Sequence, residues 1–348
     1  MLKNIITNKL SHTIIALAIT CTIPAQEKSQ LLPVTHNASF EAIELLHFLY
    51  SISGDKTLTG QHDQPIFGSA YYQLVYEKTG KHPAVKGMDF GFSKSNTLDG
   101  INFRQRVVDE AIEYHKEGAI ITLMWHAVPP TQEEPVEFRK HIQGNLTDEQ
   151  WNELLTPDSE LNRRWQTQVD VIAFFLKQLC DAHVPVLWRP YHEMNGDWFW
   201  WGKRSGENGY KRLYQMLFDR LVNYHKINNL IWVFNGNEIR GNQIGPYADY
   251  FPGHDYVDIL ATDIYSGKYP QKDYDDLMKL ADGKPVALGE VGKLPNPEIF
   301  IQQPNWVWFM TWSDYVMNKN TLAELTTIYN TDNIISREDV IILYSDLP

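Results

Sequence analysis

Short apolar runs recur along the chain, and they alternate with stretches in which apolar positions repeat every three or four residues. The runs are rich in Val, Ile, Leu and Trp and lack polar alternation, which is typical of parallel strands that are buried on both faces. We expect strands at Thr57–Gln61, Ala84–Asp89, Ala119–His126, Val184–Tyr191, Leu230–Asn235, Val257–Asp263, Pro285–Glu290 and Trp306–Trp312. Eight parallel strands are the number that closes a (β/α)8 barrel, so the pattern predicts a single-domain α/β protein with the TIM-barrel fold.

The stretches between the strands have the periodicity of amphipathic helices. We expect helices at Asn102–Lys116, Leu161–Cys180, Tyr210–His225, Asp273–Leu280 and Asp314–Tyr329. The third connection, Ala127–Arg163, is long, and Thr147 with Gln150 forms a capping-box pattern for a small helix inside it. Long loops that follow the strands of a barrel usually carry specificity, so we expect this one to shape the site.

The first 25 residues have the pattern of a secretory signal peptide. They carry Lys3 and Lys9 but no acid, and an apolar stretch at Thr13–Thr20 precedes Ile23-Pro24-Ala25. The alternative, a buried first helix, is disfavoured because Pro24 and the polar residues after it offer no continuation. The expected division is a signal peptide at 1–25, a leader at 26–38, the barrel domain at 39–330, and a C-terminal segment at 331–348 that packs on the barrel.

The expected signal peptide indicates export, either to the periplasm or out of the cell. Leu17-Ala18-Ile19-Thr20-Cys21 is similar to a bacterial lipoprotein box, in which Cys21 would carry the lipid. Thr20 departs from the small residue that such a box has just before its cysteine. Lipidation at Cys21 is therefore the less favoured form of export.

Charge and composition favour a neutral polar ligand. The formal net charge is −12, and removal of two lysines with the signal peptide leaves −14. This field repels nucleic acid and anionic membranes but does not affect a neutral polymer. Eleven tryptophans and 18 tyrosines supply flat faces with polar edges, which suit sugar rings as well as they suit a core. Nothing in the sequence implies a protein partner, and we expect a monomer.

Chemically active residues stand at the ends of all eight expected strands. These are His62-Asp63, Asp89, Trp125-His126, His192-Glu193, Asn235, Asp263 with Tyr265, Glu290 and Trp312. The carboxyl ends of parallel strands meet at one rim, where barrel enzymes carry their chemistry. A single polar residue at a strand end is usually solvated, but eight of eight indicate a site.

Glu193 and Glu290 are a natural pair for cleaving glycosidic bonds, because they end the fourth and seventh strands and nearly face each other. One carboxyl group protonates the departing oxygen, and the second attacks the anomeric carbon or activates water. We expect a separation of roughly 5–5.5 Å, which predicts net retention with Glu290 as nucleophile and Glu193 as acid and then base. Glu193 must then be protonated at working pH while Glu290 is ionised.

Neighbouring residues suggest how the two carboxyl groups are kept different. Arg189 precedes Glu193 by four residues, hence on the same face of a regular strand, and its charge would favour the ionised form of Glu290. Tyr265 could donate a hydrogen bond to the same carboxylate. The alternative for Arg189 is a purely structural ion pair. Regular alternation would point His192 away from Glu193, so both serve one site only if the strand twists or bulges.

The segments His192–Gly202 and Gly289–Gly292 resemble glycoside hydrolase family 26, which consists mainly of β-mannanases. The resemblance extends from about Thr57 to Trp312. It implies a retaining enzyme on a (β/α)8 barrel that acts on β-1,4-mannan, galactomannan or manno-oligosaccharides, by internal cutting or by releasing mannobiose. Relatives also cut β-1,3-1,4-glucan or β-1,3-xylan, and the motifs do not separate these substrates.

Matched by motif, the resemblance makes Glu193 the acid/base and Glu290 the nucleophile. It places substrate-binding residues at His126, His192, Trp198, Tyr265 and Trp312, with Trp312 under the sugar at the reactive subsite. We also expect Arg189 among the substrate-binding residues. The segment Gln61-His62-Asp63 and Asp89 align more loosely. The resemblance implies no cofactor and no metal.

Two other classes of function remain open. A carbohydrate-binding protein without turnover would keep Trp198 and Trp312 but would have no use for paired acids. A metallohydrolase could use His62, Asp63, His126 and His192, although no His-x-His or His-Glu-x-x-His pattern is present. Wild-type activity of the Glu193→Gln and Glu290→Gln variants would favour the binding protein. Complete loss of activity on chelation would favour the metallohydrolase.

Overall fold

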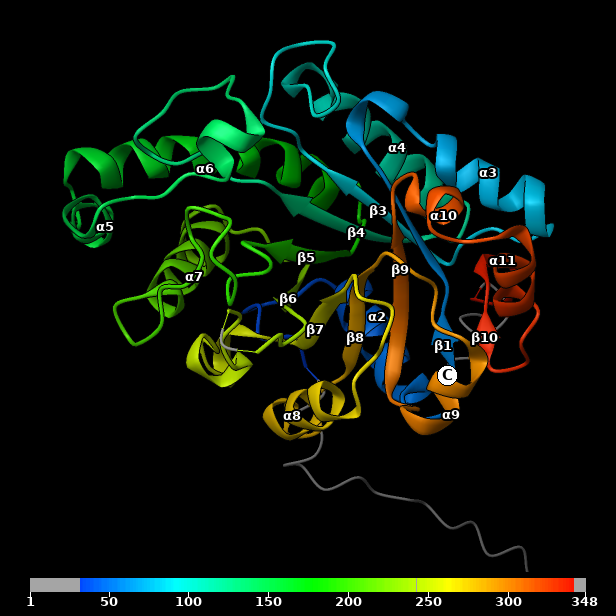
Figure 1. The fold of residues 1–348 in the computed structure, drawn as a ribbon. Helices are drawn as coiled ribbons and strands as arrows, with labels where there is room; N and C mark the ends of the chain where they lie inside the picture. Colours follow the sequence, from blue (N-terminus) through cyan, green and yellow to red (C-terminus); the bar gives the residue numbers. More distant parts are fainter. Residues whose placement is uncertain (1–31, 242, 341–348) are drawn as a thin grey trace, which may run out of the picture. The chain divides into compact units, whose positions relative to one another are not determined.

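The computed structural model describes residues 32–241 and 243–340, so the expected signal peptide lies outside the described residues. The strands form a parallel barrel with helices around it (Figure 1). Strands β2 to β9 pair in sequence order, and β9 pairs with both β8 and β2, which closes the barrel. The predicted eight-stranded (β/α)8 barrel is therefore confirmed.

Every expected strand is present, although the first is divided in two. The strands are β1 (Thr57–Leu58), β2 (Gly60–Asp63), β3 (Val85–Asp89), β4 (Ile120–Trp125), β5 (Val186–Pro190), β6 (Leu230–Asn237), β7 (Ile259–Ile264), β8 (Val286–Val291), β9 (Trp306–Trp312) and β10 (Ile334–Ile335). The expectation of one strand at Thr57–Gln61 is wrong because β1 pairs with β9 and β10, whereas β2 pairs with β9 and β3. Thr59 divides them, since its N–H and its hydroxyl both bond to the Ile335 carbonyl.

The helices alternate with the strands and include several that the periodicity did not indicate. They are α2 (Phe40–Ile52), α3 (Ala70–Thr79), α4 (Arg104–Lys116), α5 (Asp148–Leu155), α6 (Glu160–Asp181), α7 (Tyr210–Phe218), α8 (Gln271–Ala281), α9 (Pro297–Gln302), α10 (Tyr315–Asn318) and α11 (Leu322–Tyr329). A π-helical stretch, Asp219–Tyr224, continues α7. The capping box of Thr147 and Gln150 begins α5 as predicted.

The single helix expected at Asp314–Tyr329 is wrong, because the chain is interrupted between α10 and α11. The buried Asn320 donates to the Gly292 and Tyr315 carbonyls and accepts from the Leu294 N–H. The next residue, Thr321, forms a capping box with Glu324 and starts a new helix. The bonds of Asn320 to another loop therefore outweigh continuation of the helix.

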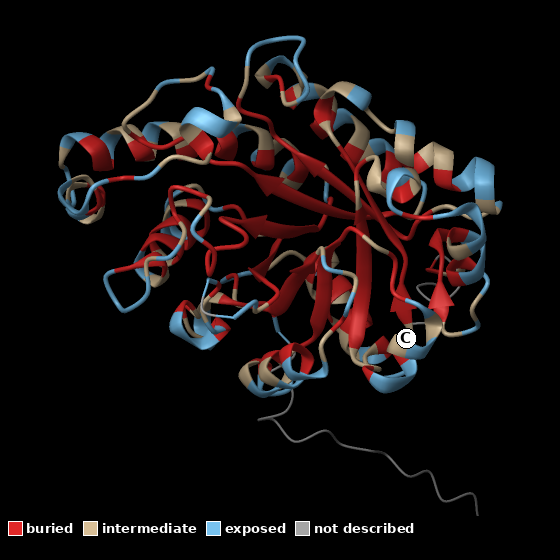
Figure 2. Ribbon diagram, in the orientation of Figure 1, coloured by how far each residue is buried: buried red, intermediate tan, exposed pale blue. Residues whose placement is uncertain are grey.

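The apolar core has two parts, and the strands are buried except at Trp312, the half-buried last residue of β9 (Figure 2). The larger part lies between the barrel and the outer helices. In the smaller part, α2 packs against residues from the beginnings of the strands, such as Val85, Ile120 and Ile259. Ser39 caps α2 by accepting from the Ala42 N–H, and six apolar side chains of the helix are buried. Helix α2 thus closes the floor of the barrel, opposite the rim where the strands end.

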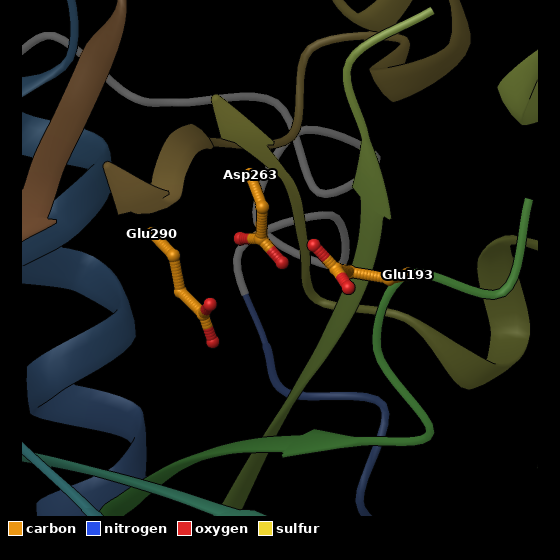
Figure 3. Close-up of side chains that lie close together, drawn as sticks. All are labelled: Glu193, Asp263 and Glu290. Carbon is orange, nitrogen blue, oxygen red and sulfur yellow. The ribbon is translucent and has the colours of Figure 1, made fainter. Parts of the chain in front are cut away.

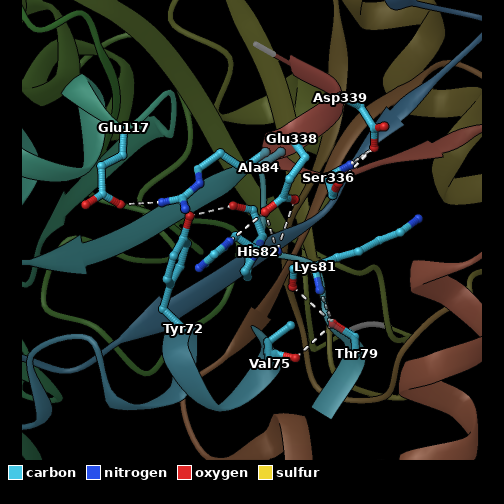
Figure 4. A network of polar contacts seen from close by, with 12 residues as sticks. Tyr72, Val75, Thr79, Lys81, His82, Ala84, Glu117, Ser336, Glu338 and Asp339 are labelled. Carbon is cyan, nitrogen blue, oxygen red and sulfur yellow. Dashed lines mark hydrogen bonds and ion pairs between the residues drawn. The ribbon is translucent and has the colours of Figure 1, made fainter. Parts of the chain in front are cut away.

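The described part of the C-terminal segment is bound to the barrel by polar contacts (Figure 4). Arg337 donates to Glu117 at 2.6 Å, and Glu338 lies 2.6 Å from the Nδ1 of His82. Ser336 in turn is held by Asp339, whose carboxylate accepts from its N–H and its hydroxyl at 2.8 Å. These contacts hold β10 beside β1.

The described end of the expected leader also contacts the barrel. The Val34 N–H donates to Asp258 at 2.7 Å, and the Thr35 hydroxyl donates to the Leu230 carbonyl at 2.8 Å. The packed unit therefore begins before the helix of residue 40. Within residues 32–241 and 243–340, no helix combines the length and the apolar character that a membrane span needs.

Candidate active site

A pocket of about 630 Å³ lies at the end of the barrel where the strands terminate. Seven residues singled out from the sequence line it: His126, His192, Glu193, Trp198, Tyr265, Glu290 and Trp312. Arg189, which we expected among the substrate-binding residues, does not line the pocket; it is buried on β5, where it contacts Glu290. The structure therefore brings together residues from five different strands or the turns that follow them.

Glu290 is held from both sides by charge and by a hydroxyl group. Its side chain projects from the interior of β8, and Oε1 accepts from Arg189 Nη2 at 2.7 Å. The Tyr265 hydroxyl donates to Oε2 at 2.5 Å. Burial, followed by the charges of Glu290 and Glu193, raises the pKa of Tyr265, so this phenol remains a donor. Both carboxylate oxygens of Glu290 are thus oriented, as the sequence suggested.

Arg189 is in turn fixed by β6 and β7. Its Nε donates to Asn235 Oδ1 at 2.9 Å, and its Nη2 lies 3.5 Å from Asp263 Oδ1. The residue before Glu290 is Gly289, where a Cβ atom would lie 1.9 Å from the same Asn235 oxygen. Only glycine leaves room for the amide that orients Arg189. Arg189 is therefore more than a structural ion pair, because one of its partners, Glu290, lines the pocket.

Glu193 does not end a strand, which corrects the expectation of a regular strand through this residue. Strand β5 ends at Pro190, and Tyr191 and Glu193 have φ values of 49° and 54°, in the left-handed region. The Glu193 N–H donates to the Asn235 carbonyl at 2.7 Å, which ties this turn to β6. The left-handed residues break the alternation, and this is why His192 and Glu193 both line the pocket.

The Glu193 carboxylate accepts hydrogen bonds from neutral donors. Trp198 Nε1 donates to Oε2 at 2.6 Å, and the Asn237 side-chain amide donates to Oε1. Burial, and then the charge of Glu290, raises the pKa of Glu193 to about 7, although the two hydrogen bonds oppose this rise. At neutral pH this carboxyl group is therefore poised to give or take a proton.

The carboxyl groups of Glu193, Asp263 and Glu290 lie close together (Figure 3), and Glu193 and Glu290 line the pocket. One oxygen each from Glu193, Asp263 and Glu290 lie within 4.8 Å of one another. The oxygens of Glu193 and Glu290 are thus closer than the roughly 6.5–9.5 Å that an inverting glycosidase keeps for water. Burial, and then the charge of Glu290, raises the pKa of Asp263 well above its usual range, so its proton reduces the repulsion.

Two histidines line the same wall in different protonation states. His126 Nδ1 is bonded to the Asp89 carboxylate, and although burial opposes it, this anion raises the pKa of His126. Burial, and then the charge of His126, lowers the pKa of His192 well below its usual range. The ring centroids lie 4.8 Å apart. His192 is therefore a neutral group facing the pocket, whereas His126 is an ion-paired one.

Trp312 also lines the pocket and is backed by His62. The rings are stacked, with centroids 4.0 Å apart and an interplanar angle of 14°. Burial, and then the charge of Arg189, lowers the pKa of His62 well below its usual range, so a neutral ring supports the indole. The adjacent Asp63 turns away and accepts from the Tyr71 and Tyr72 N–H groups at the start of α3. His62 and Asp63 are therefore not pocket residues.

The aromatic run Trp198–Trp201 divides between the pocket and the core. Trp198 and Phe199 line the pocket, whereas Trp200 and Trp201 are buried and donate to the Ala127 and His192 carbonyls. A Cβ atom at Gly196 would lie 2.1 Å from the Trp198 ring. The glycine of the motif thus lets Trp198 approach Glu193.

The metallohydrolase alternative finds no support in these contacts, because Asp63 binds the start of α3 and His126 binds Asp89. Among the described residues, one set of three possible metal ligands lies close together: Glu193, Asp263 and Glu290. Arg189 already lies against Asp263 and Glu290, so a protein cation neutralises this group.

Several pocket residues were missed from the sequence. They are Phe138, Gln143, Asp197, Phe199, Asn237, Arg240, Gln243, Ile244 and Tyr315. Phe138 and Gln143 belong to the long third connection, so the length of that loop was the available signal. Asn237 follows Asn235 by two residues on β6, and the strand period alone places both on one face.

Comparison with known proteins agrees with this geometry. The sequence model of glycosyl hydrolase family 26 matches residues 34–339. A mannan endo-1,4-β-mannosidase of Thermothelomyces thermophilus is 36% identical over 316 residues, which are 87% of this chain and 62% of that protein. The chain also spans about half the length of a Piromyces mannan endo-1,4-β-mannosidase, 49% of it, at 30% identity over 86% of this chain.

Solved structures extend the likeness to the whole barrel. The protein GH26A from Muricauda sp. is 47% identical with a TM-score of 0.84, and the match covers 87% of this chain and 98% of that one. A β-mannanase from a symbiotic protist of the termite Reticulitermes speratus, complexed with gluco-manno-oligosaccharide, is 30% identical with a TM-score of 0.76, covering 88% and 97%. From the site residues, the barrel and these matches together, the chain belongs to glycosyl hydrolase family 26.

Proposed function

We propose that this chain is a retaining glycoside hydrolase that cleaves β-1,4-mannosidic bonds in mannan, galactomannan or manno-oligosaccharides. A carboxylate oxygen of Glu290 attacks the anomeric carbon while Glu193 gives its proton to the departing oxygen, and the glycosidic bond breaks. Water then attacks the same carbon and gives a proton to Glu193, and the bond to Glu290 breaks. The first step leaves Glu193 deprotonated and Glu290 esterified, and the second step returns both glutamates to their starting states.

The observation that carries this proposal is the contrast between two carboxyl groups whose oxygens lie within 4.8 Å of each other. Glu290 forms an ion pair with Arg189. Glu193 accepts hydrogen bonds from neutral donors, and its pKa is about 7. The charge of Glu290 is the second cause of that raised pKa. When Glu290 becomes an ester, this charge is lost and the pKa of Glu193 falls. Glu193 then stays deprotonated, as the base of the second step must be.

The choice of mannan rests on the relatives. The relatives from Thermothelomyces thermophilus and Piromyces are named mannan endo-1,4-β-mannosidases. In this chain, Trp198 and Trp312 offer ring faces for sugars, and Tyr265, His126 and His192 line the same pocket. Roles for these residues as substrate contacts and for the two glutamates as catalysts are part of the proposal.

Product analysis tests substrate and mechanism together. The protein from residue 26 onward is incubated with mannan, mannohexaose, barley β-glucan and β-1,3-xylan, and the first anomer formed is followed by NMR. We expect β-configured products from mannan and mannohexaose, with chain length showing internal cutting or mannobiose release. Activity on β-glucan or β-1,3-xylan alone would replace mannan as the substrate, and an α-configured first product would overturn retention.

The matched variants Glu193→Gln and Glu290→Gln decide whether the site performs the reaction. Both keep the shape of the side chain and remove its acid, so we expect each to lose nearly all activity on mannan. Wild-type activity in both variants would exclude these groups as catalysts. Binding of mannan without turnover by the wild type would leave a carbohydrate-binding protein.

We further propose that the chain is exported with removal of residues 1–25 and acts as a monomer. The support is the charge and apolar pattern of that segment. The mass of the mature N-terminus after expression in a Gram-negative host tests the cleavage and a lipid on Cys21. Light scattering on the purified protein tests the monomer, and a stable dimer would contradict it.

A further inference from the structure

A buried asparagine next to the acid/base candidate is bonded entirely to a neighbouring backbone. Asn195 is fully buried, and its Nδ2 donates to the Asn237 carbonyl at 2.8 Å and to the Gly245 carbonyl at 3.1 Å. Its Oδ1 accepts from the Asn237 N–H at 2.7 Å. The side chain thus holds Asn237 from both sides of its backbone. Asn195 itself does not line the pocket.

The residue that Asn195 holds is the one that reaches Glu193. Asn237 is the last residue of β6, and its side-chain amide donates to Glu193 Oε1. Glu193 precedes Asn195 by two residues on a turn whose N–H at Glu193 bonds to the Asn235 carbonyl. The turn and the end of β6 therefore form a closed ring of hydrogen bonds that runs through the carboxylate.

We propose that Asn195 is a positioning residue for Glu193: by clamping the Asn237 backbone, it aims the Asn237 amide at the carboxylate and fixes the place where Glu193 exchanges its proton. This proposal rests on the proposed function, because it deepens the role of the same site. Trp198 supplies the second donor to Glu193 independently of Asn195.

The physical effect of this clamp is on the ionised form. A carboxylate that accepts a hydrogen bond is stabilised relative to the neutral acid, which has less need of the donor. Without Asn195, the Asn237 amide is free to turn away, the ionised form of Glu193 loses a donor, and the group holds its proton to higher pH. Its oxygen also loses its fixed position over the bond to be cleaved.

The test compares Asn195→Ala with Asn229→Ala on mannohexaose across a range of pH. Asn229 is also fully buried and donates to a backbone carbonyl, that of Val184, but at the floor of the barrel. We expect Asn195→Ala to lower kcat/KM by about 10–100-fold. The descending basic limb of its pH profile should move up by roughly half to one unit. Asn229→Ala should lose stability while that limb stays in place.

A second pair of variants keeps the test decisive if Asn195→Ala does not fold. Asn195→Asp keeps the acceptor for the Asn237 N–H but loses both donated bonds, and Asn237→Leu removes the donor to Glu193 directly. Both should move the same basic limb upward. An unmoved limb in every folded variant would overturn the proposal even if Glu193→Gln is inactive, whereas wild-type activity of Glu193→Gln would instead overturn the proposed function.

Discussion

The two glutamates of the pocket reach it from backbones of different kinds. Glu290 projects from within β8, and its partners are a buried cation, Arg189, and the Tyr265 hydroxyl. Glu193 stands on a turn with a left-handed backbone, and its partners are the neutral N–H groups of Trp198 and Asn237. The carboxyl groups are neighbours, yet their surroundings share no donor.

One pocket thus gives two glutamates the opposite charge states that their roles require. A fixed cation favours a partner that remains charged until it forms a bond to carbon. Neutral donors stabilise an ion less, and burial then raises the pKa of Glu193 to about 7, where a proton moves easily in either direction.

The largest effect should separate the two roles by the leaving group. Glu290→Gln should lose on the order of 10⁴-fold or more in kcat on mannan and equally on an aryl mannobioside with a good leaving group. Glu193→Gln should lose similarly on mannan but form the glycosyl-enzyme from the aryl substrate, because that group departs without a proton. Burst kinetics and intact-protein mass measure this, and equal behaviour of both variants would contradict the assignment.

Removal of the buried cation should cost both activity and stability. Arg189→Met leaves Glu290 and Asp263 without their common partner, so we expect a loss of about 3–5 kcal/mol in the free energy of unfolding. We also expect kcat to fall by roughly 10²–10³-fold, because Glu290 loses a charged donor. Urea unfolding and initial rates measure both quantities. The control Arg189→Lys should recover stability more than activity, since its point charge lacks the planar geometry of guanidinium.

Glu193 and Glu290 should respond differently when each loses one hydrogen-bond donor, because only the loss at Glu193 should move the pH profile. Trp198→Phe removes a donor that stabilises ionised Glu193, so the pKa of about 7 rises and the basic limb of kcat/KM shifts upward. Tyr265→Phe removes a donor to Glu290 and should lower kcat by roughly tenfold without shifting that limb. Profiles on mannohexaose provide the measurement, and a shift in the tyrosine variant alone would refute the contrast.

The raised pKa of Glu193 should also appear in stability. Its ordinary value is 4.5 and its value in the folded protein is about 7, so the native state holds the extra proton between these limits. Stability from this group is present at low pH and declines as pH rises toward 7 and beyond. Glu193→Gln has no such proton to lose, and its melting temperature should exceed that of wild type by a few degrees at pH 8 and by less at pH 5. An advantage that is larger at pH 5 would contradict the raised pKa.

The smallest effect is expected at the floor of the barrel, far from this contrast. Glu338 pairs with His82 at 2.6 Å, but its side chain is 46% exposed. Glu338→Gln should therefore change the free energy of unfolding by roughly 0–1 kcal/mol and leave kcat/KM unchanged. Denaturant titration and initial rates measure this, and a loss of activity would show that the floor is coupled to the site.

The strands could be predicted from the sequence because barrel strands are buried on both faces and appear as unbroken apolar runs. Helix α3 was missed since it buries only Tyr72 and Val75. Strand β10 has two residues and pairs with β1, which lies far away in the sequence. Neither element has a local pattern strong enough to distinguish it from a loop.

Site residues divide in the same way. Glu193, Glu290 and Trp312 stood out because each interrupts or ends an apolar run at the rim. Asn195 and Asn237 did not, although a hydrogen-bonded clamp joins them, because an asparagine in a turn or at the end of a strand is ordinary. Their importance comes from bonds between β6 and the turn after β5, which no spacing along the chain reveals.

By itself, the sequence determined the barrel, the rim at which its polar residues gather, and the pairing of two glutamates across that rim. These follow from strand burial and strand direction, which are written in local periodicity. The tertiary structure alone decided which donors each glutamate receives, and that the turn at Glu193 is left-handed. Hydrogen bonds between distant segments set those features, because a buried polar group must take whichever partner the fold brings to it.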